Sequence, residues 1–182
     1  MSRRKINLLI VCEDLQQSTF ARRYLIKRGF NQRKIRVKHN PSGRGAGEQF
    51  VRQQLIQEIK LHRRQRSYGK GGNTLIAMID ADKMSVQERL NQIDKELTSA
   101  GLESIKLDEK IGIFVPKRNI ETWIEYADTL NIDETVAYPK SKKPSSCKHE
   151  IDSYINTICK TGLPPNAPSS LVHACDELDK IL

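Results

Sequence analysis

Residues 6–14 read INLLIVCED and residues 74–82 read TLIAMIDAD, and these two stretches decide the fold that the sequence predicts. Each is a mostly apolar run that ends in acidic side chains. Short apolar runs with β-favouring residues are typical of strands buried on both faces, as in a parallel sheet. We therefore predict buried strands at 6–11 and 74–79, with Glu13, Asp80 and Asp82 directly after them.

The segments around the first of these strands alternate between helical and strand patterns. Residues 18–30 and 48–66 place apolar side chains at helical spacing, with basic side chains on the opposite face, and Gly29 stands where the first helix would end. Residues 34–39 (KIRVKH) alternate apolar and basic residues, which is typical of an edge or half-exposed strand. The chain therefore predicts a strand, a helix, a second strand and a second helix before residue 74.

The same alternation continues after residue 82. Ser85 and Glu88 form a capping box ahead of a helix that extends to about Gly101. Residues 110–115 (KIGIFV) predict a third buried strand, and Asn119 is expected to cap a helix in which Trp123 faces inward as a core residue.

Strands that alternate with helices imply right-handed βαβ crossovers. The predicted fold class is thus α/β, with a mostly parallel, Rossmann-like central sheet flanked by helices. A basic, Pro/Ser-rich connector at 138–146 precedes two expected closing helices, 150–160 and 169–182. We assign residues 1–137 to the α/β core and residues 138–182 to a C-terminal helical extension packed on the same domain.

The length and composition of the chain favour a single globular domain without a membrane-spanning segment. A chain of 182 residues with 37% hydrophobic content is long enough to bury one core. No run approaches the roughly 20 apolar residues that span a bilayer, and the start lacks a secretory pattern, so we expect a cytoplasmic protein with no membrane partner. Cysteines at irregular spacing in such a chain are expected to be reduced. Zinc-binding residue types occur without the paired spacing of a zinc ribbon or finger, at Cys147, His149, Cys159, His173 and Cys175.

The charge is unevenly distributed along the chain. From Arg22 to Lys70 there are 15 Lys or Arg and two acidic residues, whereas from Gly71 onward there are 13 basic and 18 acidic residues. A basic block of this kind suits a polyanion, and the alternative is a solvated, cation-rich surface. The candidate nucleic-acid-binding residues are Arg44, Arg63, Arg64, Arg66, Lys70 and Arg118.

The acidic residues after the buried strands form the candidate site. Functional groups of an open parallel sheet collect at the carboxyl ends of its strands, and a period of two would aim Asp80 and Asp82 to the same side. Clustered carboxylates repel one another unless a cation neutralises them or one takes a proton. Hard oxygen ligands without a histidine favour Mg²⁺ or Mn²⁺. The alternative for each residue is a turn or a helix cap.

These residues carry a resemblance to a known family. A Glu that closes the first hydrophobic strand, followed by Asp-x-Asp after another, resembles the TOPRIM domain of topoisomerases, bacterial primases and OLD-type nucleases. Residues 116–123 (PKRNIETW) and 168–172 (PSSLV) are similar to segments of small standalone TOPRIM proteins linked to mobile-element and phage defence. Two positions depart from the pattern: Asp14 replaces a usual glycine, and Gln17 stands where nuclease members often place a second acid.

The resemblance implies roles for individual residues. Asp80 and Asp82 would coordinate the metal, and Glu13 would either join them or relay a proton. Glu121, which opens the helix after 110–115, is the candidate for the missing ligand. Lys117 or Arg118 would stabilise the negative charge that develops during phosphodiester attack.

The expected function is a Mg²⁺- or Mn²⁺-dependent nuclease that cuts or nicks DNA or RNA. Because the chain shows no ATPase or sequence-reading module, the resemblance also implies a separate partner, such as an ATPase subunit. Two alternatives remain open: a catalytically weak nucleic-acid-binding or complex-building subunit, and a phosphoryl-transfer enzyme such as a primase-like polymerase.

Overall fold

The computed structural model describes residues 8–41, 45–68, 73–140, 152 and 162–182. Within them the chain alternates between strands and helices, in agreement with the predicted α/β class. The elements are β1 (Leu8–Cys12), α1 (Leu15–Lys27), the short 3₁₀ helix η1 (Gln32–Lys34), β2 (Ile35–His39), α2 (Gly47–Ser67), β3 (Thr74–Met78), α3 (Val86–Ser99), β4 (Ile111–Phe114), α4 (Ile120–Thr129) and α6 (Ser169–Ile181).

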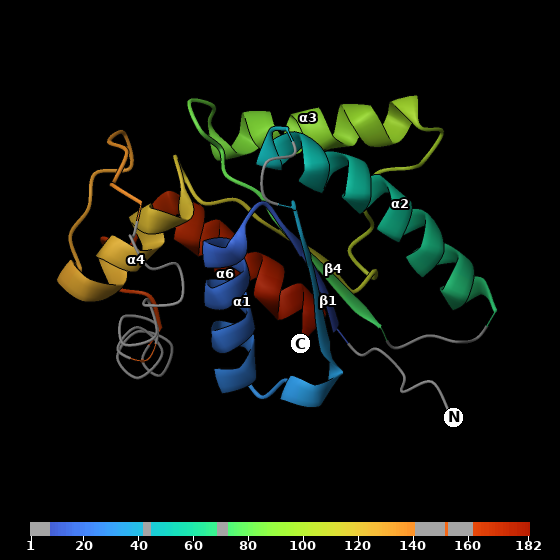
Figure 1. Cartoon of the computed structure of the whole chain (residues 1–182), viewed down its shortest axis with the longest axis horizontal. Helices are drawn as coiled ribbons and strands as arrows, with labels where there is room; N and C mark the ends of the chain where they lie inside the picture. Colours follow the sequence, from blue (N-terminus) through green and yellow to red (C-terminus); the bar gives the residue numbers. More distant parts are fainter. Residues whose placement is uncertain (1–7, 42–44, 69–72, 141–151, 153–161) are drawn as a thin grey trace.

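The four strands form one all-parallel sheet in the order β2-β1-β3-β4. Ile10 of β1 is paired with Val37 of β2 on one side and with Ile76 of β3 on the other. The chain therefore runs from β1 outward to β2 and then crosses back to β3, with α1 and α2 on opposite faces (Figure 1). Such a reversal opens a crevice at the carboxyl ends of the two central strands, where parallel α/β sheets bind ligands.

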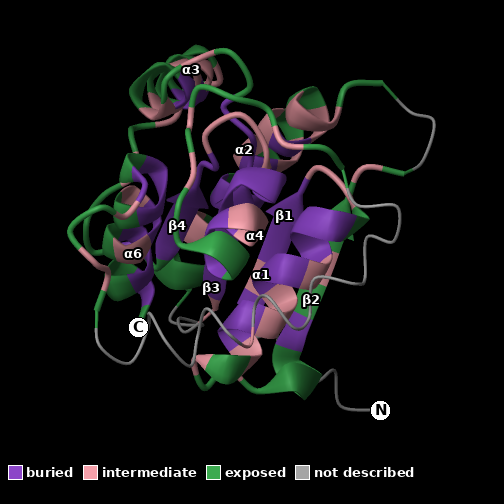
Figure 2. Cartoon of the chain, turned by 90° about the vertical axis from the view of Figure 1, so that its left-hand side faces the viewer, coloured by how far each residue is buried: buried purple, intermediate pink, exposed green. Residues whose placement is uncertain are grey.

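The helices form a layer on each face of the sheet. α2 and α3 cover one face, and α1, α4 and α6 cover the other (Figure 1). Alternating side chains of β1 supply both cores: Leu8 and Ile10 pack with α1, α4 and α6, whereas Val11 packs with α2 and α3. Figure 2 shows the buried residues concentrated along the sheet and on the helix faces turned toward it.

α1 begins at Leu15, earlier than the predicted start at Ser18. The cause is Asp14, whose carboxylate accepts hydrogen bonds of 2.9 Å from the backbone amides of Gln16 and Gln17 and so caps the helix. The predicted end is confirmed, because the helix stops at Lys27 and Gly29 follows with a φ of +97°, a conformation that glycine adopts without strain.

α4 carries the sole tryptophan into the core, as predicted. The indole nitrogen of Trp123 donates a 2.8 Å hydrogen bond to Oγ of Ser170 in α6, and both residues are buried. The expected capping role of Asn119 was wrong in one respect. Asn119 occupies the cap position, but its side chain makes no capping bond there and instead donates to the carbonyl of Tyr138 at 3.1 Å.

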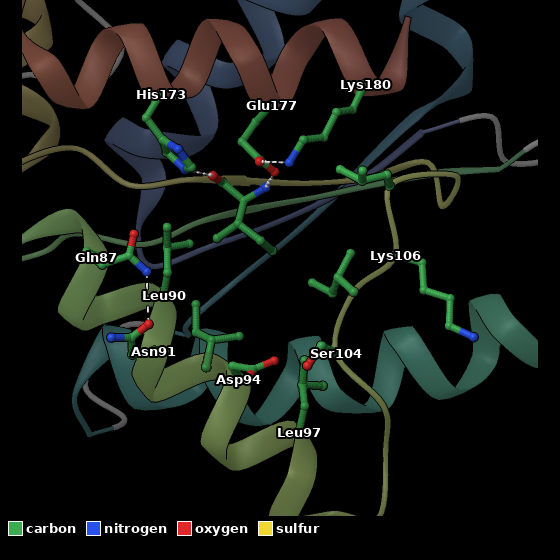
Figure 3. Close-up of a pocket in the computed structure, with 14 residues that line it drawn as sticks. Gln87, Leu90, Asn91, Asp94, Leu97, Ser104, Lys106, His173, Glu177 and Lys180 are labelled. Atoms are coloured by element: carbon green, nitrogen blue, oxygen red, sulfur yellow. Dashed lines mark hydrogen bonds and ion pairs between the residues drawn. The ribbon is translucent and has the colours of Figure 1, made fainter.

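α6 packs beside β4 and closes its outer edge (Figure 3). Glu177 accepts a 3.0 Å hydrogen bond from the backbone amide of Ile113, and Nε2 of His173 donates to the carbonyl of the same residue at 3.2 Å. Lys180 forms an ion pair with Glu177. A cavity of about 260 Å³ lies between α3, α6 and residues 104–107. The side chains of His173, Glu177 and Lys180 line it.

The C-terminal segment is described in part. The second predicted closing helix is confirmed as α6, which buries Leu171, Leu178 and Ile181. The helix predicted at 150–160 lies outside the described residues except for Asp152, which is ion-paired with Arg23 of α1. None of the described helices is long and apolar enough to span a membrane.

Candidate functional site

The two acidic stretches that the sequence singles out lie at the crevice between β1 and β3. Glu13 follows β1 directly, and Asp80 follows β3 after one intervening residue. Because β1 and β3 are neighbouring parallel strands, their carboxyl ends meet at the same edge of the sheet. The fold thus brings Glu13 and Asp80 together from positions 67 residues apart.

A closed ring of hydrogen bonds joins these two residues to Gln17. The backbone amide of Asp80 donates to Oε1 of Glu13 at 2.6 Å. Nε2 of Gln17 donates to Oδ1 of Asp80 at 2.8 Å, and Oε1 of Gln17 accepts from the backbone amide of Glu13 at 2.9 Å. The ring therefore fixes the ends of β1 and β3 and the first turn of α1 relative to one another.

Burial and mutual repulsion disfavour the charged forms of both acids. Burial raises the pKa of Glu13 from its ordinary 4.5 to about 7, against the opposing effect of the hydrogen bond from Asp80 and with the support of the negative charges of Asp82 and Asp14. Burial, followed by the charges of Glu13 and Glu121, raises the pKa of Asp80 well above its ordinary 3.8. Carboxylates in this state are stabilised by a bound cation or by a shared proton.

Glu121 adds a third carboxyl group, which is buried in the first turn of α4. Neither of its oxygens accepts a hydrogen bond from another described residue. Burial raises its pKa, whereas its own backbone amide and then the cationic side chain of Lys140 oppose the shift. Lys140 itself lies 3.6 Å from the carboxylate of Asp14, so this lysine acts on both Asp14 and Glu121. A buried carboxyl group with no donor from another described residue is stabilised by a proton, by water or by a bound cation.

Asp82 is placed differently from Asp80. It adopts a φ of +54°, so the strand period that would aim both side chains to one side does not extend to it. Its Oδ2 lies 3.1 Å from Nη2 of Arg89. The Arg89 side chain is only 4% exposed and also contacts Glu48 at 3.2 Å, whereas the Asp82 side chain is 59% exposed. Asp82 thus lies at the exposed edge of the acidic site, where the buried Arg89 holds it.

The amino end of α2 lies against Glu13. A Cβ atom placed on Gly47, the first residue of the helix, would stand 2.9 Å from Cβ of Glu13 and 3.0 Å from its Oε2. Such distances are below van der Waals contact, so glycine is required for this approach. The positive end of the α2 dipole therefore faces the acidic site.

The two cationic residues expected to act in catalysis are engaged at the border of the site. The ammonium group of Lys117 donates to the carbonyl of Met84. Arg118 has a φ of +67°, and its guanidinium group donates to the carbonyl of Thr135 at 2.9 and 2.7 Å. Their described hydrogen bonds are thus to backbone carbonyls, and either side chain would have to turn to reach Glu13 or Asp80.

The basic residues near the end of α2 differ from one another. Arg63 forms a two-point ion pair with Glu109, at 2.7 and 2.9 Å, and also donates to two backbone carbonyls. Arg66 pairs with Asp108 at 2.7 Å on the surface, and Arg64 is exposed. Arg44 and Lys70 lie outside the described residues.

The residue types at this site suit a divalent cation, but their side chains are not arranged as a binding site for one. The carboxyl groups of Asp80 and Glu121 are buried and that of Glu13 is half-buried, and the negative charges of Glu13 and Glu121 both act on Asp80. Carboxylate oxygens are the ligands that Mg²⁺ or Mn²⁺ prefers. Within the described ranges, however, no three Asp, Glu, His or Cys side chains are grouped closely enough to hold an ion. The zinc-type residues Cys147, His149 and Cys159 lie outside those ranges, and His173 is bonded to β4.

The sequence alone did not reveal the roles of Gln17 and Arg89. Gln17 is completely buried at the position four residues after Glu13, in the first turn of α1. Arg89 shares the helical spacing of the apolar residues Val86 and Ile93. This spacing places it on the inward face of the helix, and it could have indicated from the sequence that Arg89 is buried. Comparisons with family models, with curated proteins and with solved structures found no match.

Proposed function

We propose that this chain is a divalent-metal-dependent nuclease that cuts or nicks DNA or RNA phosphodiesters. The observation that carries the proposal is the presence of three carboxyl groups around the crevice between β1 and β3. Asp80 and Glu121 are buried and Glu13 is half-buried, and the oxygens of Glu121 accept no hydrogen bond from another described residue. Mutually repelling carboxylates in a ligand-binding crevice are the surroundings that a hard cation stabilises.

Four residues would hold the cation: Glu13, Asp80, Asp82 and Glu121. Asp82 would first have to leave its ion pair with Arg89, which its exposed position permits. When bound, Mg²⁺ or Mn²⁺ would polarise the phosphoryl group and lower the pKa of water. The hydrogen bonds from Gln17 and from the backbone of Asp80 orient the carboxylates before any ligand arrives.

Glu13 is the candidate proton acceptor. A carboxyl group with a pKa of about 7 exchanges a proton readily at neutral pH, which is the range that general acid–base catalysis uses. In this role Glu13 would take the proton of the attacking water, and Lys117 or Arg118 would turn from its carbonyl partner toward the developing negative charge. If Glu13 binds the cation instead, the proton has to leave through solvent.

The substrate class follows from the charge of the chain. Cations of the basic block between Arg22 and Lys70 would contact the phosphate backbone, with Arg64 exposed on α2 and Arg118 at the border of the acidic site. The resemblance to standalone TOPRIM proteins supports a role in defence against phage, in the cytoplasm, beside a separate ATPase subunit. Purification from the native host under gentle conditions should recover that subunit in near-equal amounts, and recovery of the chain alone would contradict the partnership.

A cleavage assay on labelled DNA and RNA tests the activity, with Mg²⁺ or Mn²⁺ and with EDTA. Wild type should cleave with metal and not with EDTA. Glu13→Gln should reduce the rate by about 100-fold or more, and Asp80→Asn should abolish cleavage while nucleic-acid binding remains. Asp94→Asn on the exposed face of α3 makes the same chemical change outside the site and should cleave normally. Wild-type rates in the folded Asp80→Asn and Glu13→Gln variants would overturn the proposal.

A second candidate function has its own support. Gln17 donates to Asp80, and Arg89 holds Asp82, so two of the expected ligands already have partners. This arrangement suits a nucleic-acid-binding or complex-building subunit with little catalytic activity. Retention of labelled nucleic acid by the wild type, with no cleavage in Mn²⁺, would favour it over the nuclease.

A further inference from the structure

A groove lies beside the edge of the sheet that β2 forms, between β2 and the second half of α2. Its volume is about 410 Å³, which is within the usual range for a ligand-binding pocket. Leu9 of β1 and Leu75 of β3 contribute to its apolar lining, together with Leu61 of α2, which is 41% exposed. Arg36 and Lys38 line it from β2. The groove therefore combines an apolar surface with cationic side chains.

One positive charge of the groove is not cancelled. Lys38 forms an ion pair of 2.6 Å with Glu58 of α2, which is the acidic residue that lines the groove. Arg36 is exposed and forms no ion pair with any residue that the structure describes. The nearby residues Arg33 and Lys34 of η1 are also exposed. This side of the groove therefore attracts anions, and phosphate is an anion that a guanidinium group binds through two hydrogen bonds.

Side chains on the α2 side of the groove have hydrogen-bonding atoms that the fold leaves unused. Nδ2 of Asn73 donates to Oε1 of Gln65 at 3.0 Å, and Oδ1 of Asn73 has no partner among the described residues. Nε2 of His62 lies 3.1 Å from the carbonyl of Asn73, and Nδ1 of the same histidine has no described partner either. Buried polar atoms without a partner are rare, and at the wall of a groove they favour a ligand with polar edges.

An exposed aromatic side chain stands at the end of the same helix. Tyr68 occupies the cap position of α2 and is 72% exposed. It follows Gln65 by three residues and Leu61 by seven, a spacing that places the three side chains on one face of the helix. An aromatic ring that is not buried in the core and lies near cations is typical of proteins that stack the bases of single-stranded nucleic acid. Tyr68 thus extends the groove with a surface for a flat aromatic group.

We propose that the groove and Tyr68 form a binding site for single-stranded DNA or RNA, in which Arg36 contacts a phosphate and an unpaired base stacks on Tyr68. The apolar lining and the unused hydrogen-bonding atoms of the groove receive a neighbouring base. A base within a duplex is already paired and stacked, so the site selects single strands. The inference rests on the nucleic-acid substrate of the proposed function, and on neither its cation nor its cleavage step.

The length of α2 relates the groove to the acidic site. α2 begins at Gly47, which lies against Glu13, and reaches the groove at Leu61. Fourteen residues of helix separate Gly47 from Leu61, a distance of about 20 Å. A strand of several nucleotides held in the groove can therefore extend to the crevice between β1 and β3, whereas a mononucleotide cannot occupy both places.

Fluorescence anisotropy of labelled oligonucleotides in EDTA measures binding without cleavage. Tyr68→Ala should weaken the binding of single-stranded DNA or RNA by about 5- to 100-fold, the usual effect of removing a stacking ring, and Tyr68→Phe should match wild type. Arg36→Ala should also weaken binding and should make the slope of log affinity against log salt shallower by about 0.7. Leu107→Ala and Lys95→Ala remove an exposed apolar and an exposed cationic side chain elsewhere and should match wild type.

Three further ligands separate this site from a surface that only attracts negative charge. An abasic strand has the same phosphates without bases, so wild type should bind it about as weakly as Tyr68→Ala binds the normal strand. Poly-glutamate has negative charge without phosphates or bases and should displace the strand only weakly. Duplex DNA should bind equally to wild type and Tyr68→Ala, because its bases are not free to stack.

Each outcome supports or overturns the inference. An unchanged affinity in Tyr68→Ala, equal binding of the abasic and the normal strand, or no binding of single strands by wild type would overturn it. Strong displacement by poly-glutamate would assign the groove to an acidic protein partner and would also overturn it. Wild type that binds single strands through Tyr68 and Arg36 but cleaves none would overturn the nuclease function and leave the inference standing. Cleavage by wild type with unchanged binding in both variants would do the reverse.

Discussion

Arg63 and Glu109 form two parallel hydrogen bonds, Nε to Oε1 at 2.7 Å and Nη2 to Oε2 at 2.9 Å, between the end of α2 and the loop before β4. The Glu109 side chain is 4% exposed. A basic residue that its position in the sequence assigned to nucleic-acid binding therefore ties two parts of the fold together. This contact separates Arg63 from its exposed neighbour Arg64.

The first prediction concerns this difference. Arg63→Ala should lower the free energy of unfolding by about 3 kcal/mol, because it leaves the buried carboxylate of Glu109 without its partner. Arg64→Ala, at an exposed position, should change it by less than about 0.5 kcal/mol and should weaken nucleic-acid binding instead. Urea unfolding and a binding titration measure the two effects. Equal stability of the two variants would contradict the structural role of Arg63.

The second prediction is a pH dependence of the same pair. The hydrogen bond from Arg63 holds the pKa of Glu109 below its ordinary 4.5. The pair's contribution to stability is therefore complete above that ordinary value and is lost as the pH falls through the lower pKa of the folded state. Glu109→Gln should be less stable than wild type at about pH 6, and the difference should shrink toward about pH 3. A difference in unfolding free energy that stays constant over this range would contradict the prediction.

The third prediction concerns Gly47. In a helix interior, Gly→Ala normally stabilises by up to about 1 kcal/mol, and at the first position the gain is smaller. Here the new methyl group would press on Glu13, so Gly47→Ala should displace that side chain. The variant should lose most of any rise in melting temperature caused by Mn²⁺, whereas Gln49→Ala in the same turn should keep it. A full Mn²⁺ response in Gly47→Ala would show that the approach of α2 to Glu13 is unimportant.

The fourth prediction concerns the core. Ser170→Ala removes the acceptor of the indole N–H of Trp123 and should cost about 1–3 kcal/mol, the usual cost of a buried donor left without a partner. Because the chain has one tryptophan, its fluorescence reports this site directly during urea unfolding. Ser99→Ala, at the exposed end of α3, serves as the control and should change stability by less than about 0.5 kcal/mol.

The sequence predicted the elements of the fold well, because the strands of the parallel sheet are near-continuous apolar runs and the helices have apolar residues at helical spacing. INLLIV and TLIAMI gave β1 and β3, and KIRVKH gave an edge strand. The strand order could not be deduced in this way, since it depends on the face that each helix covers. The start of α1 was misplaced because Asp14 was considered only as a departure from the family pattern and not as a helix cap.

The site was predicted less completely than the fold. Acidic residues at strand ends are visible in a sequence, and Glu13 and Asp80 do lie side by side. The partners that control them are not visible, because Gln17 reaches Asp80 and Arg63 reaches Glu109 only after the chain has folded. A charged side chain near a helix end reads as solvated until the loop that pairs with it is known.

The closure of β4 by α6 has a consequence for self-association. The edge strands of an open β-sheet have unpaired main-chain N–H and C=O groups, which can pair with a strand of another molecule. On β4, the side chains of His173 and Glu177 occupy the main-chain groups of Ile113 that a new strand would use. Within the part of the chain that the structure describes, β2 is then the edge left for main-chain pairing, and the exposed cationic side chain of Arg36 disfavours a like-charged partner strand there. The two described edges of the sheet are thus protected in different ways, one by an occupied main chain and the other by charge.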